Sequence, residues 1–101
     1  MPFINAGRVA DLAVGEVREI LVGDRPFAIC NVAGAIYALD GVCPHQGGPL
    51  GQGHLEGAYL ACPYHLWEFD CRSGEYDRSP THRIATYAVR IEDGEILIEV
   101  A

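Results

Sequence analysis

Short hydrophobic runs separated by turn residues follow one another along the whole chain. Apolar and β-branched residues dominate 17–21, 27–32 and 36–39; VGDRP separates the first two runs, and Ala33-Gly34 precedes the third. Gly, Asp and Pro are turn residues, and no apolar run keeps a helical period over three turns. This pattern predicts an all-β protein that begins with a three-stranded antiparallel meander.

A fifteen-residue segment near the C-terminus gives the clearest local pattern. In TYAVRIEDGEILIEV, residues 86–100, polar and apolar residues alternate on both sides of Asp93-Gly94. Asp-Gly tolerates the positive φ angles of a tight hairpin turn. We therefore expect a C-terminal β-hairpin centred on this dipeptide.

Length and charge narrow the range of functions. The chain has 101 residues, enough for one domain, and carries a formal charge of -7 from 14 acidic residues against 7 basic ones. A surplus of carboxylates disfavours nucleic acid and anionic membranes as partners, and favours a protein partner with a basic face. No run approaches the roughly 20 apolar residues of a membrane span, and Met1-Pro2-Phe3 starts no export signal. We expect a cytoplasmic protein whose thiols stay reduced.

Two loops rich in Gly and Pro each contain one Cys and one His. GVCPHQGGPL carries Cys43-x-His45, and CPYHLWEF carries Cys62-x-x-His65. Two thiolates and two imidazoles suit either tetrahedral zinc or a 2Fe-2S cluster with two Cys on one iron and two His on the other. Zinc sites usually pair like with like, so a mixed pair on each loop favours the cluster. A zinc-stabilised interaction module remains the alternative.

The residues around these ligands suit the same interpretation. Glycines allow backbone N–H groups to approach cluster sulfides closely, and prolines stiffen loops. The residues in question are Gly47, Gly48, Gly51, Pro44, Pro49 and Pro63.

At C-x-H and C-x-x-H the chain resembles the Rieske iron–sulfur proteins. The resemblance implies an antiparallel β base, residues 1–39 and 81–101, with a smaller inserted cluster-binding subdomain, residues 40–80. It also implies that Cys43 and Cys62 bind the inner iron of a 2Fe-2S cluster and that His45 and His65 bind the outer iron.

Within that family the chain is similar to the small ferredoxins of bacterial multicomponent oxygenases. CPHQGGPL and HLWEF resemble the ferredoxins of toluene-type monooxygenases in particular. The resemblance implies a monomeric electron carrier, not an enzyme, that takes one electron from a flavin-containing reductase and delivers it to a terminal oxygenase. The partner surface would be the His-bearing edge, ringed by Pro49, Leu50, Tyr64 and Leu66. A permanent small subunit of a reductase such as nitrite reductase is the second candidate.

Two departures from other Rieske proteins bear on the site. Those of quinol-oxidising respiratory complexes have a disulfide between the two loops, where this chain has Gly48 and Tyr64. They also place hydroxyl donors near the cluster, where this chain has Trp67 and Phe69. Because fewer donors stabilise the reduced cluster less, we expect this chain to have a reduction potential that is low among Rieske proteins.

The remaining candidates receive simpler interpretations. Cys30 is expected to be a small buried hydrophobe, and Cys71 a non-ligand. His54 and His82 are expected to be solvated loop residues. Trp67 is either a core aromatic that supports its loop or a contact for the partner. The carboxylates after the second loop form a solvated face or steer a basic partner; they are Glu68, Asp70, Glu75 and Asp77.

Overall fold

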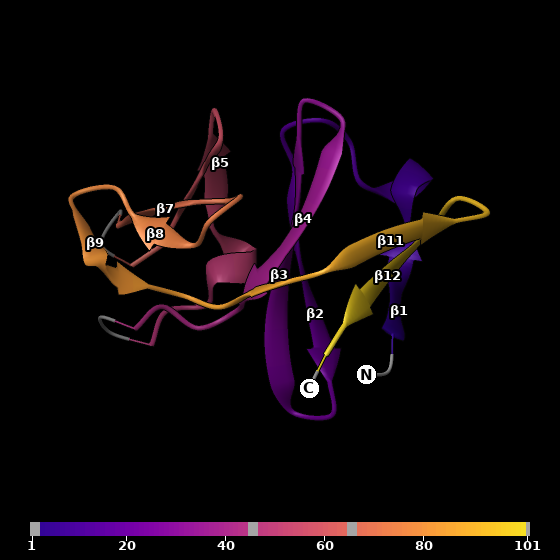
Figure 1. Ribbon diagram of the computed structural model, residues 1–101, viewed down its shortest axis with the longest axis horizontal. Helices are drawn as coiled ribbons and strands as arrows, with labels where there is room; N and C mark the ends of the chain where they lie inside the picture. Colours follow the sequence, from indigo (N-terminus) through magenta and orange to yellow (C-terminus); the bar gives the residue numbers. More distant parts are fainter. Residues whose placement is uncertain (1–2, 45–46, 65–66, 101) are drawn as a thin grey trace.

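A computed structural model describes residues 3–44, 47–64 and 67–100, and every strand pairing in it is antiparallel (Figure 1). The first sheet has the order β1 (Phe3–Arg8), β12 (Glu95–Glu99), β11 (Val89–Glu92). The second has the order β10 (Thr86–Tyr87), β4 (Ala35–Asp40), β3 (Arg25–Val32), β2 (Val17–Val22). The third has the order β5 (His54–Glu56), β6 (Tyr59–Ala61), β7 (Glu68–Asp70), β8 (Glu75–Tyr76), β9 (Ser79–Arg83). Two single 3-10 turns accompany them, η1 (Val9–Asp11) and η2 (Leu50–Gln52). The all-β prediction is confirmed.

The first two sheets form the base, and both predicted hairpin patterns are present in it. Strands β2, β3 and β4 are the expected meander, and β11 and β12 are the expected C-terminal hairpin. The Asp93-Gly94 turn adopts the left-handed backbone expected of it, with φ of 52° at Asp93 and 76° at Gly94, and Ala33 also has a positive φ, 54°. Asp93 and Gly94 both have positive φ, as a tight two-residue hairpin turn requires.

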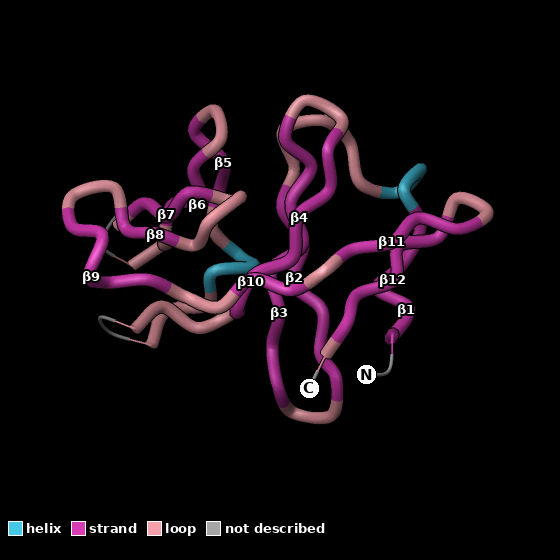
Figure 2. Tube along the Cα trace, in the orientation of Figure 1, coloured by secondary structure: helices cyan, strands magenta, loops and turns pink. Residues whose placement is uncertain are grey.

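The third sheet is inserted between β4 and β10, and we call it the inserted sheet. It lies to one side of the base, with β5, β7, β8 and β9 at the left of Figure 1. The chain enters it through loop 41–53 and returns to the base at β10, which Figure 2 labels between the two parts. A base with a smaller inserted part is the architecture expected from the sequence.

Two apolar cores hold these parts together. The base core contains Phe27, Ile29 and Ile98, together with Leu12 and Ile96. The second core joins β3 and β4 to the inserted sheet through Leu39, Leu50, Leu60 and Phe69, all fully buried. The second core also contains all four cysteines: Cys30, Cys43, Cys62 and Cys71.

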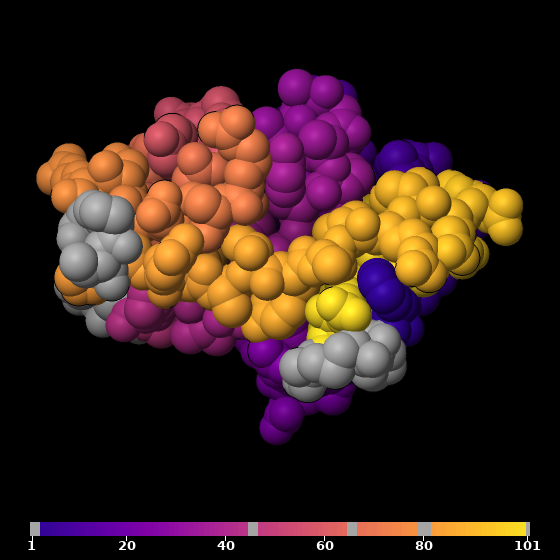
Figure 3. Space-filling model, viewed as in Figure 1, coloured from indigo at the N-terminus to yellow at the C-terminus, as the bar shows by residue number. Residues whose placement is uncertain are grey.

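A polar network secures the place where the chain leaves and re-enters the base. The Tyr87 hydroxyl donates a hydrogen bond to Asp40 Oδ1 at 2.6 Å and accepts one from Arg25 Nη2. Arg25 Nη2 also lies 3.8 Å from Asp40 Oδ1. Asp40 is the last residue before the insertion, and Tyr87 ends the strand after it, so the network joins both crossings. Figure 3 shows the returning chain crossing the face between the two parts.

Candidate functional site

The two loops that carry the predicted ligands are each closed by backbone hydrogen bonds. In loop 1, residues 43–49, the Cys43 N–H donates to the Gly48 carbonyl at 2.9 Å, and the Gly47 N–H donates to the Cys43 carbonyl at 2.8 Å. In loop 2, residues 62–67, the Cys62 N–H donates to the Trp67 carbonyl at 2.8 Å. Both cysteines are buried: Cys43 is 1% exposed and Cys62 is 0% exposed.

Gly48 brings the two loops into contact. A Cβ atom built on Gly48 would lie 2.7 Å from Cys62 Sγ and 3.2 Å from two ring atoms of Tyr64. Gly48 itself is buried and does not have a positive φ. It is therefore a glycine because of the space at this point and not because of its backbone angles, and it lets loop 1 pack directly on loop 2.

The predicted histidine ligands lie outside the described residues. Positions 45 and 65 are not among the segments 3–44, 47–64 and 67–100. Within those segments, no group of three or more His, Cys, Asp or Glu side chains is arranged to hold a metal ion. The structure thus brings the two cysteine loops together, and the assignment of four ligands stays a prediction.

Comparison with known protein families identifies the chain. The profile of the Rieske [2Fe-2S] domain matches residues 3–88. The chain belongs to the Rieske family.

Named Rieske relatives cover almost the whole chain. The ferredoxin component of the naphthalene 1,2-dioxygenase system of Pseudomonas putida is 34% identical over 98% of this chain and 96% of its own length. The ferredoxin component of the alkene monooxygenase system of Xanthobacter autotrophicus is 31% identical over 95% of this chain and 80% of its own length. These relatives are named as ferredoxin components of oxygenase systems, which confirms the prediction of a Rieske electron carrier rather than a catalytic oxygenase.

Solved structures share the Rieske fold. A ferredoxin from Sphingomonas yanoikuyae B1 superposes with a TM-score of 0.89 at 29% identity, covering 99% of this chain and all of that one. A chain in a complex of oxygenase and ferredoxin from carbazole 1,9a-dioxygenase gives a TM-score of 0.87 at 28% identity, covering 95% of this chain and 100% of that one. A putative nitrite reductase small subunit from Mycobacterium tuberculosis, at 21% identity and a TM-score of 0.87, covers 99% of this chain and 96% of its own length and shares the fold alone.

The described part of the Rieske site fits the [2Fe-2S] cluster of the family. Cys43 and Cys62 lie in one apolar core, on loops that touch each other. Thiolate sulfur is the ligand that iron–sulfur clusters take, and two such ligands suffice for one iron when histidines hold the other. This family membership removes the zinc module from the alternatives.

An aromatic group supports loop 2 from the inserted sheet. Trp67 stacks on Tyr76 with ring centroids 4.0 Å apart and planes at 12°. The His82 ring packs edge-on against Trp67 at 5.9 Å and against Tyr76 at 6.3 Å. Trp67 is half-buried and packs against the second core, so a supporting role is visible. His82 is exposed as expected, but it lies in strand β9 and not in a loop.

Two other expectations change on structural grounds. Leu50 does not ring an exposed edge: turn η2 directs it inward, and it is 0% exposed. Beside it, Gly51 lets the chain pack closely on β2, because a Cβ there would lie 2.5 Å from Glu19 Cβ. His54 belongs to strand β5 and not to a loop. It is exposed as expected, with Nε2 3.7 Å from Glu56 Oε2.

The sequence did not reveal a contact between the other two cysteines. Cys30 on β3 is fully buried as expected, and Cys71, in the turn after β7, is fully buried as well. The hydrogen bond between the two thiols, together with burial, raises the pKa of Cys30. The same hydrogen bond lowers the pKa of Cys71. The contact joins the base to the inserted part of the chain. No spacing signal could have found this pair, since Cys30 lies on β3 of the base and Cys71 follows β7 of the inserted sheet.

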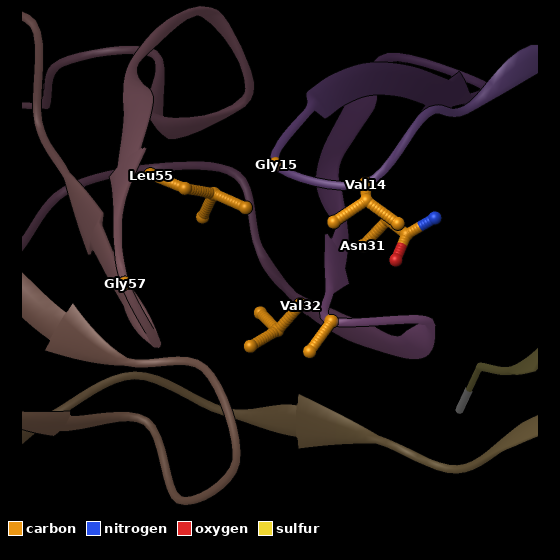
Figure 4. Close-up of a pocket in the computed structure, with 7 residues that line it drawn as sticks. Val14, Gly15, Asn31, Val32, Leu55 and Gly57 are labelled. Atoms are coloured by element: carbon orange, nitrogen blue, oxygen red, sulfur yellow. The ribbon is translucent and has the colours of Figure 1, made fainter.

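An apolar pocket of about 310 Å³ lies between the two parts of the molecule. Leu55 of β5 faces Val14 and Val32 across it (Figure 4). Asn31 is the polar side chain in the lining, and its amide is already occupied: Nδ2 donates to the Leu12 carbonyl and Oδ1 accepts from the Gly34 N–H, both at 2.8 Å. The pocket therefore presents mostly hydrocarbon.

Proposed function

We propose that this Rieske protein carries single electrons from a flavin-containing reductase to a terminal oxygenase. The observation that carries the proposal is the pair of touching loops, each with a buried cysteine inside a C-x-H or C-x-x-H motif. The ferredoxin components named above supply the partner classes.

In this proposal Cys43 and Cys62 hold one iron of the cluster and His45 and His65 hold the other. The cluster supplies one-electron redox chemistry when bound. Residues 40–80 form the cluster-binding subdomain, and residues 1–39 with 81–101 form the base. The inserted sheet supports this division except at its end: its five strands follow one another from β5 to β9, and β9 extends to Arg83, three residues past the proposed boundary.

The partner would dock on the two loops. Neither 41–53 nor 61–67 contains an Asp, Glu, Lys or Arg, although the chain carries a formal charge of -7. Val42 is 46% exposed and Tyr64 is 64% exposed, and Pro44 and Pro63 are exposed beside them. Such an uncharged apolar face suits the small interface, below about 1,200 Å², of a transient electron-transfer complex.

The acidic residues after loop 2 contribute less to steering than their number suggests. Asp70 Oδ1 lies 3.5 Å from Arg72 Nε, and Glu75 Oε2 lies 3.9 Å from Arg83 Nη2. Asp70 and Glu75 thus each have a cation of the same chain beside them, which reduces the field of these two carboxylates at a distance. Contact between apolar surfaces, rather than long-range attraction, would determine the affinity for the partner.

The protein would act as a cytoplasmic monomer. In the portion of the chain that the structure describes, no helix has the length and apolar character needed to cross a bilayer.

Purified protein tests the proposal directly. Iron analysis and electron paramagnetic resonance of the reduced protein should show a [2Fe-2S] cluster with nitrogen ligation, and H45A or H65A should abolish that signal. A flavin-containing reductase and a terminal oxygenase from a ferredoxin-dependent oxygenase system are then the probes. Stopped-flow absorbance should show the first reducing the protein and the second reoxidising it. Reduction without reoxidation by the oxygenase would overturn the proposed role.

Gel filtration separates the shuttle from a permanent reductase subunit. A shuttle should elute alone after mixing with either partner at micromolar concentration. Stable co-elution with a large reductase subunit would favour the second candidate.

A further inference from the structure

Tyr64 makes a direct side-chain contact between the two ligand loops. Two of its ring atoms and Cys62 Sγ converge on the point where a Gly48 Cβ would stand, at 3.2 Å and 2.7 Å. Gly48 is buried, whereas Tyr64 is 64% exposed. One part of the ring therefore lies on the backbone of loop 1, and the rest faces solvent.

We propose that the Tyr64 ring is a non-covalent clasp that holds loop 1 against loop 2 and keeps water from the Cys62 sulfur. The inference rests on the proposed assignment of Cys62 as a cluster ligand. In this chain Gly48 and Tyr64 stand where the respiratory Rieske proteins have their disulfide, so the contact occupies the position of a covalent link. Tyr64 acts through Cys62 and Gly48 and is a positioning residue.

The clasp adds a contact between the loops to the hydrogen bonds inside each loop. The backbone hydrogen bonds of Cys43 and Gly47 lie within loop 1, and that of Cys62 lies within loop 2. The contact at Gly48 joins one loop to the other. Opening at this point would admit water to Cys62, which is fully buried in the closed arrangement.

The size of the effect follows from the area that the ring covers. Tyr64 is 64% exposed, so about a third of its surface is covered. Aromatic side chains bury about 150–250 Å² when fully enclosed, so removing the ring exposes on the order of 60 Å² of apolar surface. At about 25 cal/mol per Å², losing the burial of this surface makes separation of the two loops about tenfold more frequent.

Opening also bears on the cluster's redox properties. Water near the sulfur stabilises the more negative, reduced cluster, so greater access raises the reduction potential. An upward shift of the potential is therefore expected together with faster opening.

The experiment compares Tyr64→Ala, Tyr64→Phe and Tyr59→Ala with the wild type, all as the cluster-loaded full chain. Tyr59 is a matched control because it is an exposed tyrosine on β6. Three quantities are measured: the rate of iron release to an excess of a colorimetric chelator, the amide hydrogen exchange of Gly47 and Gly48, and the reduction potential.

Tyr64→Ala should release iron about tenfold faster, exchange faster at Gly47 and Gly48 and show a higher potential. Tyr64→Phe and Tyr59→Ala should behave as the wild type, because the first keeps the ring and the second lies elsewhere. Wild-type rates in Tyr64→Ala, or equal acceleration in Tyr59→Ala, would overturn the clasp. Equal acceleration in Tyr64→Phe would also overturn it, because the hydroxyl rather than the ring would then be responsible.

Failure of the clasp and failure of the proposed ligand set give different results. A Cys62→Ala chain that still binds a full cluster would refute the ligand assignment. If Cys62→Ala loses the cluster while Tyr64→Ala keeps wild-type rates and potential, only the clasp is refuted.

Discussion

Replacing Tyr87 by Phe isolates the polar network that joins the insertion to the base. The substitution removes the hydroxyl that donates to Asp40 and accepts from Arg25. It keeps the ring, which packs edge-on against Phe27 with centroids 5.1 Å apart and planes at 79°. The Arg25 guanidinium also remains 5.4 Å from the ring centroid. The change therefore tests two hydrogen bonds without creating a cavity.

The expected loss of stability in Tyr87→Phe is modest because water can reach Arg25 and Asp40. A hydrogen bond to a charged group contributes about 1.5–3 kcal/mol. The side chains of Arg25 and Asp40 are 46% and 36% exposed, and they still face each other at 3.8 Å. Solvation of both should reduce the cost to about 1 kcal/mol, which lowers the melting temperature by about 4–8 °C in a domain of this size.

The pH dependence gives a sharper signature of the same network. Burial, and then the hydrogen bond to Asp40, raise the pKa of Tyr87 above its usual value of 10.0. A group with a raised pKa in the folded state stabilises fully below its unfolded pKa and loses that contribution as pH rises through the folded value. The difference between wild type and Tyr87→Phe should therefore be constant below about pH 9 and shrink above pH 10.

Melting followed by far-ultraviolet circular dichroism measures both effects. Cluster loss accompanies unfolding, so midpoints are compared at one heating rate and one protein concentration. Tyr59→Phe serves as the control, because it deletes a hydroxyl from an exposed tyrosine of the inserted sheet. A Tyr87→Phe midpoint within 1 °C of wild type, or a difference that grows above pH 10, would refute the reasoning.

Three further predictions concern the potential and the packing. The reduction potential should lie near the lower end of the Rieske range of about -150 to +300 mV, because Trp67 and Phe69 bring no hydroxyl to the cluster; a redox titration well above zero would contradict this. Gly53→Ala should destabilise the protein by about 3 kcal/mol or more, since its Cβ would lie 1.9 Å from the Ala61 carbonyl oxygen; Gln52→Ala, at an exposed neighbour, should melt normally. Cys30→Ala and Cys71→Ala should each cost about 1–2 kcal/mol, keep the full iron content, and combine non-additively because they remove one shared contact; strictly additive midpoints would argue against that contact.

The base was predictable because its strands are long enough to show a pattern. Six to eight residues of β2, β3 and β4, bounded by Gly and Asp turns, fix strand positions without tertiary information. The same holds for the turn at Asp93. Strands of two or three residues, as in β6 or β8, carry no periodicity, so the inserted sheet was visible only as loops.

The site was predictable in its ligand-type residues and not in its packing. C-x-H and C-x-x-H are local spacings, and local spacings can be read from a chain. The inward turn of Leu50 depends on η2 packing against β2 and β3, and the crowding at Gly51 depends on Glu19. The contact between Cys30 and Cys71 depends on how two sheets meet. Such features arise from residues far apart in sequence, and no single stretch reports them.

The pairing of β1 with β12 determines where other proteins can be attached to this chain. Phe3 stands opposite Glu99 in that ladder, so both ends leave the molecule from the base and not from the two loops (Figure 1). An affinity tag or an electrode linker added at either end should leave the apolar face open to incoming proteins. Linking the ends to each other and cutting the chain at an exposed hairpin would be a tolerated rearrangement.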